Sequence, residues 1–342
     1  GLSHNASAQI VTSQSKFLDK SRPQAPNLAA EAAADYRQKA RFPEWSEPIP
    51  DGYGDPLKNK RQPTEQSLPQ NDDWTMSVRT SGIAFESGQT AVLHASVKAR
   101  TDHDDDFPLA GLYGPPPKDW EITGMVAKLD GSELGRVSYR DDGVAPDQKG
   151  GDGVYTASFT LPAAHQPKVG TAENLAVFVT ANSASGDELK ALGGMLYSHP
   201  AGQLTGRYRD SIVDGDLVIQ AEVEIQAAAR FQLAGTLDSD KGRSLVSARM
   251  AEHLEVGTHW LDLRFYGLAL SERGASGPLT LGTVTLTTAN GIPNALGPLM
   301  ENTHRTQSYR ANSFHTREFG RADLMETARR LERDAARHGS RD

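Results

Sequence analysis

The residues most able to do chemistry lie between Tyr139 and Leu161, in the sequence YRDDGVAPDQKGGDGVYTASFTL. Carboxylate oxygens are the hard ligands that Ca²⁺ prefers, and this stretch offers four of the side chains that carry them: Asp141, Asp142, Asp147 and Asp152. The glycines between them permit backbone conformations that are closed to other residues, so the chain can turn sharply around an ion. The stretch therefore predicts a calcium site built from these four aspartates.

The same aspartates have a second interpretation that needs no metal. Aspartate side chains form Asx-turns and cap strand ends in many β-rich proteins. The spacing also differs from the twelve-residue calcium loop between two helices, because no glutamate closes the stretch and its flanks alternate like strands. Calcium binding and turn formation are therefore both consistent with the sequence, and Ca²⁺ is the one cofactor it suggests.

Other polar groups have simpler explanations than catalysis. His253 and His259 flank LEVGT, where two surface histidines in a turn explain the spacing better than a zinc pair. Glu222 and Glu224 alternate along one strand, so both are expected on its solvent-facing side. An acidic run before Phe107 could bind cations, although a solvated charge run explains it as well; it consists of Asp102, Asp104, Asp105 and Asp106, with His103 inside it.

The common enzyme signatures are missing from the chain. The sequence has no G-x-S-x-G elbow, no H-E-x-x-H zinc helix and no phosphate-binding G-x-x-x-x-G-K-[ST] loop. With no cysteine, it also lacks thiolate metal ligands and cysteine nucleophiles. A carbohydrate-binding module would need an exposed aromatic platform, for which Trp120, Trp260 and Tyr266 are the candidates. These observations favour a protein that is not an enzyme.

Length and composition limit the partners and the compartment. The chain has 342 residues and a formal net charge of −8, and it has no long basic run of the kind that nucleic acids require. No apolar run approaches the ~20 residues that span a bilayer. Gly1 cannot be a translation start, so Gly1 to His4 is either the terminus left by signal-peptide removal or a remnant of cloning. We expect an exported protein, in the periplasm, at the cell surface or outside the cell.

The elements that must position these residues are mostly strands. Alternating apolar and polar residues, separated by Gly, Asp and Pro turns, predict an all-β fold of two immunoglobulin-like or jelly-roll β-sandwich domains. An extended N-terminal arm precedes the sandwiches and a C-terminal helix follows them. The predicted parts are an arm over residues 1–72, a first sandwich over 73–190, a second over 191–290 and a tail over 291–342.

The two terminal parts carry the predicted attachment points. Alanine and charged helix formers predict a helix over 28–40, and a narrow apolar stripe predicts another over 321–337. Between prolines, Phe42, Trp45, Ile49 and Tyr53 form an extended strap suited to plugging side chains into grooves. The strap could cover the chain's own β-domain or a partner, and after Asn290 the β pattern is expected to stop.

Three stretches resemble a bacterial family of exported β-sandwich proteins called choice-of-anchor X. They are YRQKARFPEWSEPIPDGYGDPL, then YRDDG with GGDGVYTASFT, and LYSHPAGQLTGRYRDSIVDGDLVI. The predicted second sandwich is also similar to the β-jelly-roll appended to secreted subtilisin-like proteases, a module that can hold calcium. Those modules usually have a longer Asp-Gly insertion where this chain offers only Asp210, Asp214 and Asp216, and the anchors that give the family its name are missing here.

The sequence therefore predicts a non-enzymatic, exported structural or interaction protein. It would bind protein partners or assemble with itself through the N-terminal strap and the C-terminal helix, with calcium as a stabiliser. The competing hypothesis is a secreted hydrolase of peptides or polysaccharides, or its accessory module, which would need a deep cleft with converging carboxylates or histidines.

Overall fold

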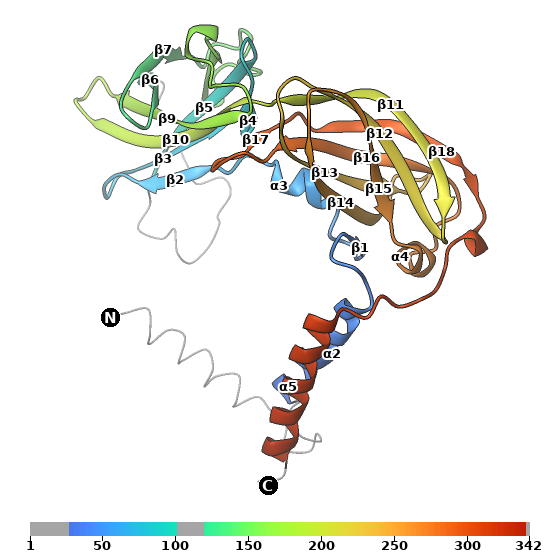
Figure 1. The fold of residues 1–342 in the computed structure, drawn as a ribbon. Helices are drawn as coiled ribbons and strands as arrows, with labels where there is room; N and C mark the ends of the chain where they lie inside the picture. The colour runs from blue at the N-terminus through green and yellow to red at the C-terminus, as the bar shows by residue number, and fades with distance from the viewer. Residues whose placement is uncertain (1–26, 101–119, 340–342) are drawn as a thin grey trace. The chain divides into compact units, whose positions relative to one another are not determined.

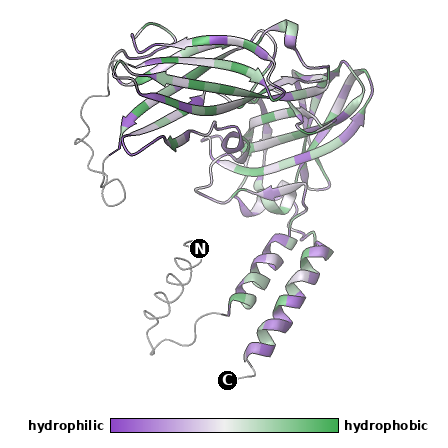
Figure 2. Ribbon diagram, turned by 90° about the vertical axis from the view of Figure 1, so that its left-hand side faces the viewer, coloured by the Kyte–Doolittle hydropathy of each residue, from purple (hydrophilic) through white to green (hydrophobic). Residues whose placement is uncertain are grey.

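The computed structural model describes residues 27–100 and 120–339, and they form a mostly β protein (Figure 1). Hydrophobic and hydrophilic residues alternate along many of the strands, as a sheet with one buried face requires (Figure 2). The all-β prediction is therefore confirmed. The chain divides into two compact units: residues 45–315, which hold all the strands of the described residues, and residues 1–44 with 316–342.

The first sandwich has a five-stranded and a four-stranded sheet. The larger runs in the order β4-β10-β9-β6-β7 and the smaller in the order β2-β3-β5-β8. The strands of the larger sheet are β4 (Ala84–Phe85), β6 (Glu121–Lys128), β7 (Glu133–Tyr139), β9 (Thr171–Asn182) and β10 (Glu188–His199). Those of the smaller are β2 (Gln66–Pro69), β3 (Trp74–Thr80), β5 (Thr90–Ala99) and β8 (Val154–Thr160), and the short 3-10 helix η1 (Ala163–His165) follows β8.

The second sandwich has a six-stranded sheet facing a three-stranded one, β11-β12-β15. The six-stranded sheet consists of β1 (Ser46–Pro48), β13 (Ala229–Asp238), β14 (Ser244–Leu254), β16 (Gly277–Thr288), β17 (Ala295–Leu296) and β18 (Met300–Tyr309). The other strands are β11 (Gly202–Val213), β12 (Asp216–Ile225) and β15 (Gly257–Phe265). The second sandwich also includes three short helices: α3 (Pro56–Lys60), α4 (Gly267–Glu272) and η2 (Ala311–Ser313).

The first sandwich begins earlier and ends later than the predicted 73–190. Strand β2 adds residues 66–69 through its pairing with β3, and β10 continues along β9 as far as His199. Only Pro200 and Ala201 separate β10 from β11. The core between the two sheets includes the fully buried Met76, Leu93 and Ile122.

The prediction that the β pattern stops after Asn290 is wrong. Residues 295–296 form β17 and residues 300–309 form β18, and both pair with β16 (Figure 1). Two register shifts interrupt the pairing of β18 with β16, so its side chains do not alternate with a period of two. Several of its side chains are polar and bind polar partners, which removes the apolar signal by which strands are recognised.

The strap covers the chain's own second sandwich. Strand β1 extends the six-stranded sheet by pairing with β14, Ile49 is buried, and Trp45 packs edge-on against Tyr266. Tyr53, by contrast, is 71% exposed, so it does not plug a groove as expected. Asp55 holds the next part of the strap, because one carboxylate oxygen caps the start of α3 and the other accepts hydrogen bonds from two threonines of the sheet, Thr236 and Thr283.

The compact unit of residues 1–44 and 316–342 contains two helices that are far apart in the sequence. Helix α2 (Leu28–Ala40) begins and ends where the sequence predicts, and α5 (Ala322–Gly339) closely matches the predicted 321–337. Asn27 caps α2 by accepting a hydrogen bond from the backbone of Ala29. None of the helices in the described residues is long and apolar enough to cross a membrane.

Asp238, in β13, gives the second sandwich a pH dependence. Burial raises the pKa of Asp238 to about 6, the nearby Asp55 carboxylate adds to this, and Ser244 and Lys58 oppose it. The unfolded chain has the ordinary value of about 3.9. Between these pH values the folded state binds more protons than the unfolded state, so the free energy of unfolding should fall as pH rises from about 4 to about 6.

Asp238→Asn should remove this fall, because the amide stays neutral over the whole range. Urea unfolding at several pH values between about 4 and about 7 measures it. Asp240→Asn, an exposed neighbour in the next turn, is the matched control and should keep the slope of the parent protein. Equal slopes in the two variants would contradict the assignment to Asp238.

Candidate functional site

The loop between β7 and β8 contains the predicted metal ligands. It turns at Gly143 and Gly151, both with φ of +74°, a backbone conformation that residues other than glycine rarely adopt. Asp141 holds the two ends of the loop together, because its carboxylate accepts hydrogen bonds from the backbone nitrogens of Gly151 at 2.8 Å and Gly153 at 2.9 Å. The loop is thus closed by a carboxylate that bonds to the backbone.

Three of the four predicted ligands come together in this loop. One carboxylate oxygen from each of Asp141, Asp147 and Asp152 lies within 4.8 Å of the others. Asp147 is buried and accepts a hydrogen bond of 2.7 Å from the backbone nitrogen of Gly143. Asp152 is exposed, and its carboxylate accepts a hydrogen bond from the backbone nitrogen of Val154. Asp142 is not in this group, because its carboxylate points into its own turn and accepts from Val144.

This geometry suits a hard cation and also suits turn formation. Three carboxylates this close repel one another, and a divalent ion bound by their oxygens would offset that repulsion. Ca²⁺ takes six to eight oxygen ligands, so water would complete its shell on the exposed side, next to Asp152. Each aspartate also bonds to backbone nitrogens, as Asx-turns do. The calcium site stays a prediction.

Of the other sequence candidates, His253, His259 and Glu222 bond to neighbouring groups of the fold. The rings of His253 and His259 both bond to Glu255, the first to its carboxylate and the second to its carbonyl oxygen. Glu224 is exposed as expected, but the expectation for Glu222 is wrong. Glu222 is buried because a bulge in the neighbouring β11 places Thr205 over it, at 2.9 Å from its carboxylate. The acidic run with Asp102, Asp104, Asp105, Asp106 and His103 lies outside the described residues.

The aromatic candidates do not form an exposed platform. Trp120 and Tyr266 are buried, at 6% exposure each, so neither can stack against a sugar ring. Trp260 is half-buried, and the guanidinium of Arg209 lies 3.6 Å from the centre of its ring. The three residues point to packing and cation-π contacts within the protein instead of carbohydrate binding.

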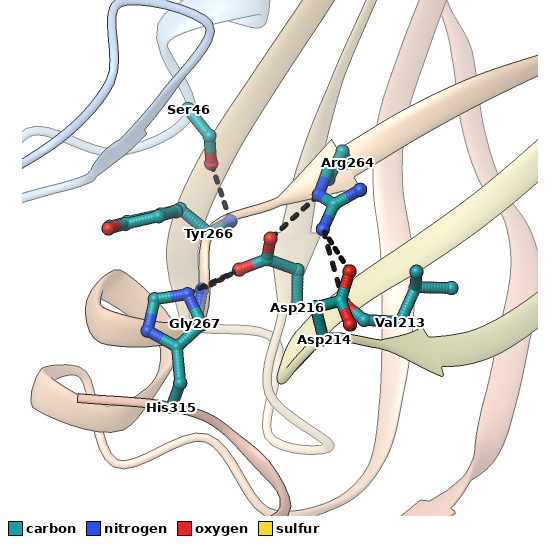
Figure 3. Close-up of polar contacts among 8 residues, drawn as sticks. All are labelled: Ser46, Val213, Asp214, Asp216, Arg264, Tyr266, Gly267 and His315. Carbon is teal, nitrogen blue, oxygen red and sulfur yellow. Dashed lines mark hydrogen bonds and ion pairs between the residues drawn. The ribbon is translucent and has the colours of Figure 1, made fainter. Parts of the chain in front are cut away.

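Sequence reasoning missed a buried carboxylate, Asp216, that joins three parts of the second sandwich (Figure 3). One of its oxygens accepts hydrogen bonds from the backbone of Gly267 at 2.6 Å and from His315 Nε2 at 2.8 Å. The other oxygen accepts from Arg264 Nε at 2.6 Å. We call Asp216, Arg264, Gly267 and His315 the Asp216 cluster. His315 and Asp216 are 99 residues apart in the sequence, so no local sequence pattern predicts the cluster.

Glycines make the Asp216 cluster sterically possible. A Cβ atom on Gly267 would lie 2.3 Å from the carbonyl oxygen of Gly215, and one on Gly215 would lie 2.7 Å from the Cβ of His315. The ring of Tyr266 meets the ring of His315 edge-on at 4.6 Å, and the backbone nitrogen of Tyr266 donates to Ser46 of the strap (Figure 3). The cluster therefore fixes both the strap and the segment that leads to α5.

Asp210, in β11 shortly before Asp216, forms a second carboxylate-histidine pair. Its carboxylate binds His304 Nε2 at 2.7 Å and also accepts from the hydroxyl of Tyr309, so it attaches β18 to β11. Burial, with the neighbouring Asp210 carboxylate, raises the pKa of Tyr309 above its ordinary value. Asp214 is exposed, at 3.9 Å from Arg264. Asp210 thus binds His304 and Tyr309, whereas Asp214 and Asp216 both lie near Arg264, and within the described residues the three aspartates do not form a metal group.

A calcium titration with Asp152→Asn distinguishes metal binding from turn formation. The amide keeps an oxygen for the bond to Val154 but removes one negative charge from the group of three. If calcium binds, it should raise the thermal midpoint of the parent protein, with about 2.7 kcal/mol of stabilisation at a calcium concentration one hundred times the Kd. Asp152→Asn should lose most of that rise.

The control for the calcium titration is Asp142→Asn, which lies in the same loop but outside the group of three. It should respond to calcium as the parent protein does. A parent midpoint that does not change with millimolar calcium would contradict the metal site and leave the aspartates as turn formers.

Asp216→Asn should destabilise the second sandwich by about 3 kcal/mol, the lower end of the cost of breaking a buried charge pair. The lower end applies because the side chain of Arg264 is 36% exposed and can turn to water. Urea unfolding measures the change. Asp214→Asn, in the same hairpin with an 83% exposed side chain, should change stability little; an equal loss in both variants would contradict the role given to Asp216.

Comparison with known proteins finds a family model that matches one part of the chain. Residues 201–292 match the family model described as the C-terminal domain of a domain of unknown function, DUF4785. No curated protein matches the chain. The resemblance to choice-of-anchor X proteins and to the protease appendage therefore stays a prediction.

Solved structures give distant likenesses to the chain. One is a DUF4785 family protein from Legionella pneumophila subsp. pneumophila str. Philadelphia 1, with 15% identity and a TM-score of 0.43, covering 70% of this chain and 57% of that one. Another is a tetra-tandem repeat in the extending region of a large adhesion protein, with 13% identity and a TM-score of 0.21, covering 70% of this chain and 57% of that one. The second sandwich, which holds Asp216, is thus similar in sequence to the DUF4785 C-terminal domain.

Proposed function

We propose that this chain is a non-enzymatic, exported β-sandwich protein that assembles with copies of itself or with protein partners through its paired terminal helices. The observation that carries the proposal is the pairing of α2 and α5, which come from opposite ends of the chain yet belong to one compact unit. The strap is occupied by the chain's own second sandwich, so the proposed attachment surface is limited to the helices.

The two helices pack antiparallel. Asn27, before the start of α2, donates to the carbonyl oxygen of Ala335 near the end of α5. At the other end, the backbone nitrogen of Arg321 donates to Ala40. The guanidinium of Arg37 binds both carboxylate oxygens of Glu332, which fixes the register between these two contacts.

The packing between the helices is thin. Only alanines are fully buried within them, at positions 33, 40 and 328, and each methyl group contributes little hydrophobic free energy. Larger apolar residues, among them Tyr36, Leu324 and Leu331, are only half-buried. Hydrophilic residues cover most of α5, with hydrophobic ones between them (Figure 2). Helices of 13 and 18 residues are marginal in water by themselves, so further apolar contact would stabilise the pair.

The spacing of the apolar residues favours a helical partner. Ala29, Ala33, Tyr36 and Ala40 follow one another at intervals of four, three and four residues, as do Leu324, Ala328, Leu331 and Ala335. This is the spacing of a coiled-coil seam. Two such pairs from two copies could share their half-buried residues in a four-helix bundle.

The non-enzymatic part of the proposal rests on how the carboxylates and histidines of the described residues are used. Asp210 and Asp216 each bind a histidine together with further donors, and these contacts attach one strand or segment to another. They serve the fold. Calcium in the loop between β7 and β8 would stabilise the first sandwich and is not needed for any reaction.

Sedimentation velocity over a wide range of concentrations tests the self-assembly part of the proposal. The parent protein should form dimers or larger species as concentration rises. Leu324→Glu with Leu331→Glu should be monomeric and lose helix content, because carboxylates then occupy the seam. Ala336→Glu, on an exposed position of the same helix, is the control and should assemble normally.

A parent protein that stays monomeric at all concentrations would contradict self-assembly. Hydrogen exchange then tests the remaining part of the proposal. Strong protection of α2 and α5 in that monomer would show that the pair is stable without a partner, and the argument for docking through it would fail.

A further inference from the structure

A cavity of about 460 Å³ lies at the junction of the two sandwiches, and the proposed function makes no use of it. Its volume is within the range of ~300 to 1,000 Å³ that is typical of small-molecule sites. Apolar side chains from both sandwiches line it, including Phe85 before the turn into β5 and Leu296 and Leu299 around β17. Two residues of opposite charge also line it: Arg61, which follows α3, and Glu86, which follows β4.

The junction that forms this cavity is tightly held. Ser198 donates to the carbonyl oxygen of Leu296 at 2.9 Å, and the hydroxyl of Thr288 accepts from the backbone nitrogen of Ala201 at 2.9 Å in a buried position. Ala172, Leu196 and Ala295 form a small hydrophobic cluster between the sandwiches. The cavity walls are therefore attached to each other by hydrogen bonds and apolar packing from both sides.

The two charges at the cavity are half-buried and are not paired with each other. Within the described residues, Arg61 makes one side-chain hydrogen bond, from Nη2 to the hydroxyl of Thr285 at 3.1 Å, which leaves its other donors to the cavity side. Within residues 27–100 and 120–339, the carboxylate of Glu86 has no hydrogen bond or ion pair; both bonds at this residue are made by its backbone, to the side chain and the backbone nitrogen of Gln89.

Burial disfavours both charges. It lowers the pKa of Arg61 and raises the pKa of Glu86. The one titratable group that acts against the shift at Glu86 is His199, whose Nδ1 bonds to the carbonyl oxygen of Pro167. Two desolvated groups of opposite charge that face one cavity would be relieved by a ligand that carries both complementary charges.

We propose that the junction cavity binds a small apolar zwitterion, an amino acid or dipeptide, with its carboxylate on Arg61, its ammonium on Glu86 and its side chain against Phe85 and the leucines. A guanidinium suits a carboxylate because its parallel donors can bind both oxygens. A neutral apolar ligand would leave both charges desolvated and unpaired, and a simple anion would lie against Glu86 without compensating it. The zwitterion satisfies both ends of the site.

Calorimetric titration of the full chain tests the proposal with probes that differ in one charge each. Leucine and leucyl-leucine carry both charges, N-acetyl-leucine lacks the ammonium, and leucinamide lacks the carboxylate. At least one of the two zwitterions should bind saturably, and loss of either charge should weaken binding about tenfold or more. Which zwitterion binds more tightly reports the size of the ligand.

Two variants connect each probe to its residue. In Glu86→Gln, N-acetyl-leucine, which lacks the ammonium, should no longer bind more weakly than the zwitterion. In Arg61→Gln, leucinamide, which lacks the carboxylate, should no longer bind more weakly than the zwitterion. Arg61→Gln keeps a donor for Thr285, which helps it fold, and Arg61→Lys serves as the charge-conserving check. The exposed Arg230→Gln and Glu252→Gln are the matched controls and should bind as the parent protein does.

Three results would overturn the proposal. The first is the lack of saturable binding of both zwitterions to the folded parent protein. The second is binding that is insensitive to Glu86→Gln and Arg61→Gln, and the third is an equal loss of binding in the control variants. Because the titration does not involve the terminal helices, its outcome is independent of whether the chain self-assembles.

Discussion

The hydrogen bonds of the buried carboxylate of Asp216 are the interactions on which the second sandwich most depends. Asp216 lies at the start of β12 and binds the end of β15, the first residue of α4 and the segment that leads to α5. Removing this carboxylate would take one acceptor from a backbone nitrogen, an imidazole and a partly exposed guanidinium at the same time, which costs more than the net gain from a single hydrogen bond. Tyr266 and Ser46 extend the same network to the strap.

Polar anchors of this kind recur wherever an irregular segment returns to a sheet. Asp55 attaches the strap to β13 and β16, and Asp210 attaches β18 to β11. In each case one carboxylate accepts several donors from segments that are far apart in the sequence. A chain without disulfides can hold the strap and β18 against its second sandwich in this way. The strap also covers a sheet edge, because β1 pairs with β14 and so takes up backbone groups that would otherwise be exposed.

The proposed sites differ in how strongly the structure constrains them. Asp141, Asp147 and Asp152 are held in place by backbone nitrogens of their own loop, so their closeness is a local property of the turn. The junction cavity depends on contacts between two sandwiches, and Arg61 and Glu86 reach it from segments that no sequence pattern connects. The helix pair depends on the meeting of two termini. The last two proposals therefore rest on tertiary contacts.

The sequence by itself determined what is local. Period-two alternation predicted the sandwiches, alanine-rich and amphipathic stretches predicted α2 and α5, and the glycine and aspartate pattern predicted the loop in which three carboxylates meet. These features follow from forces between residues a few positions apart. The tertiary structure alone decided that residues 300–309 join a sheet, that Glu222 and Tyr266 are buried, and that His315 reaches Asp216. The reason is that burial and pairing between distant segments depend on which surfaces meet, and a strand such as β18, whose side chains bind polar partners, carries no apolar period by which to recognise it.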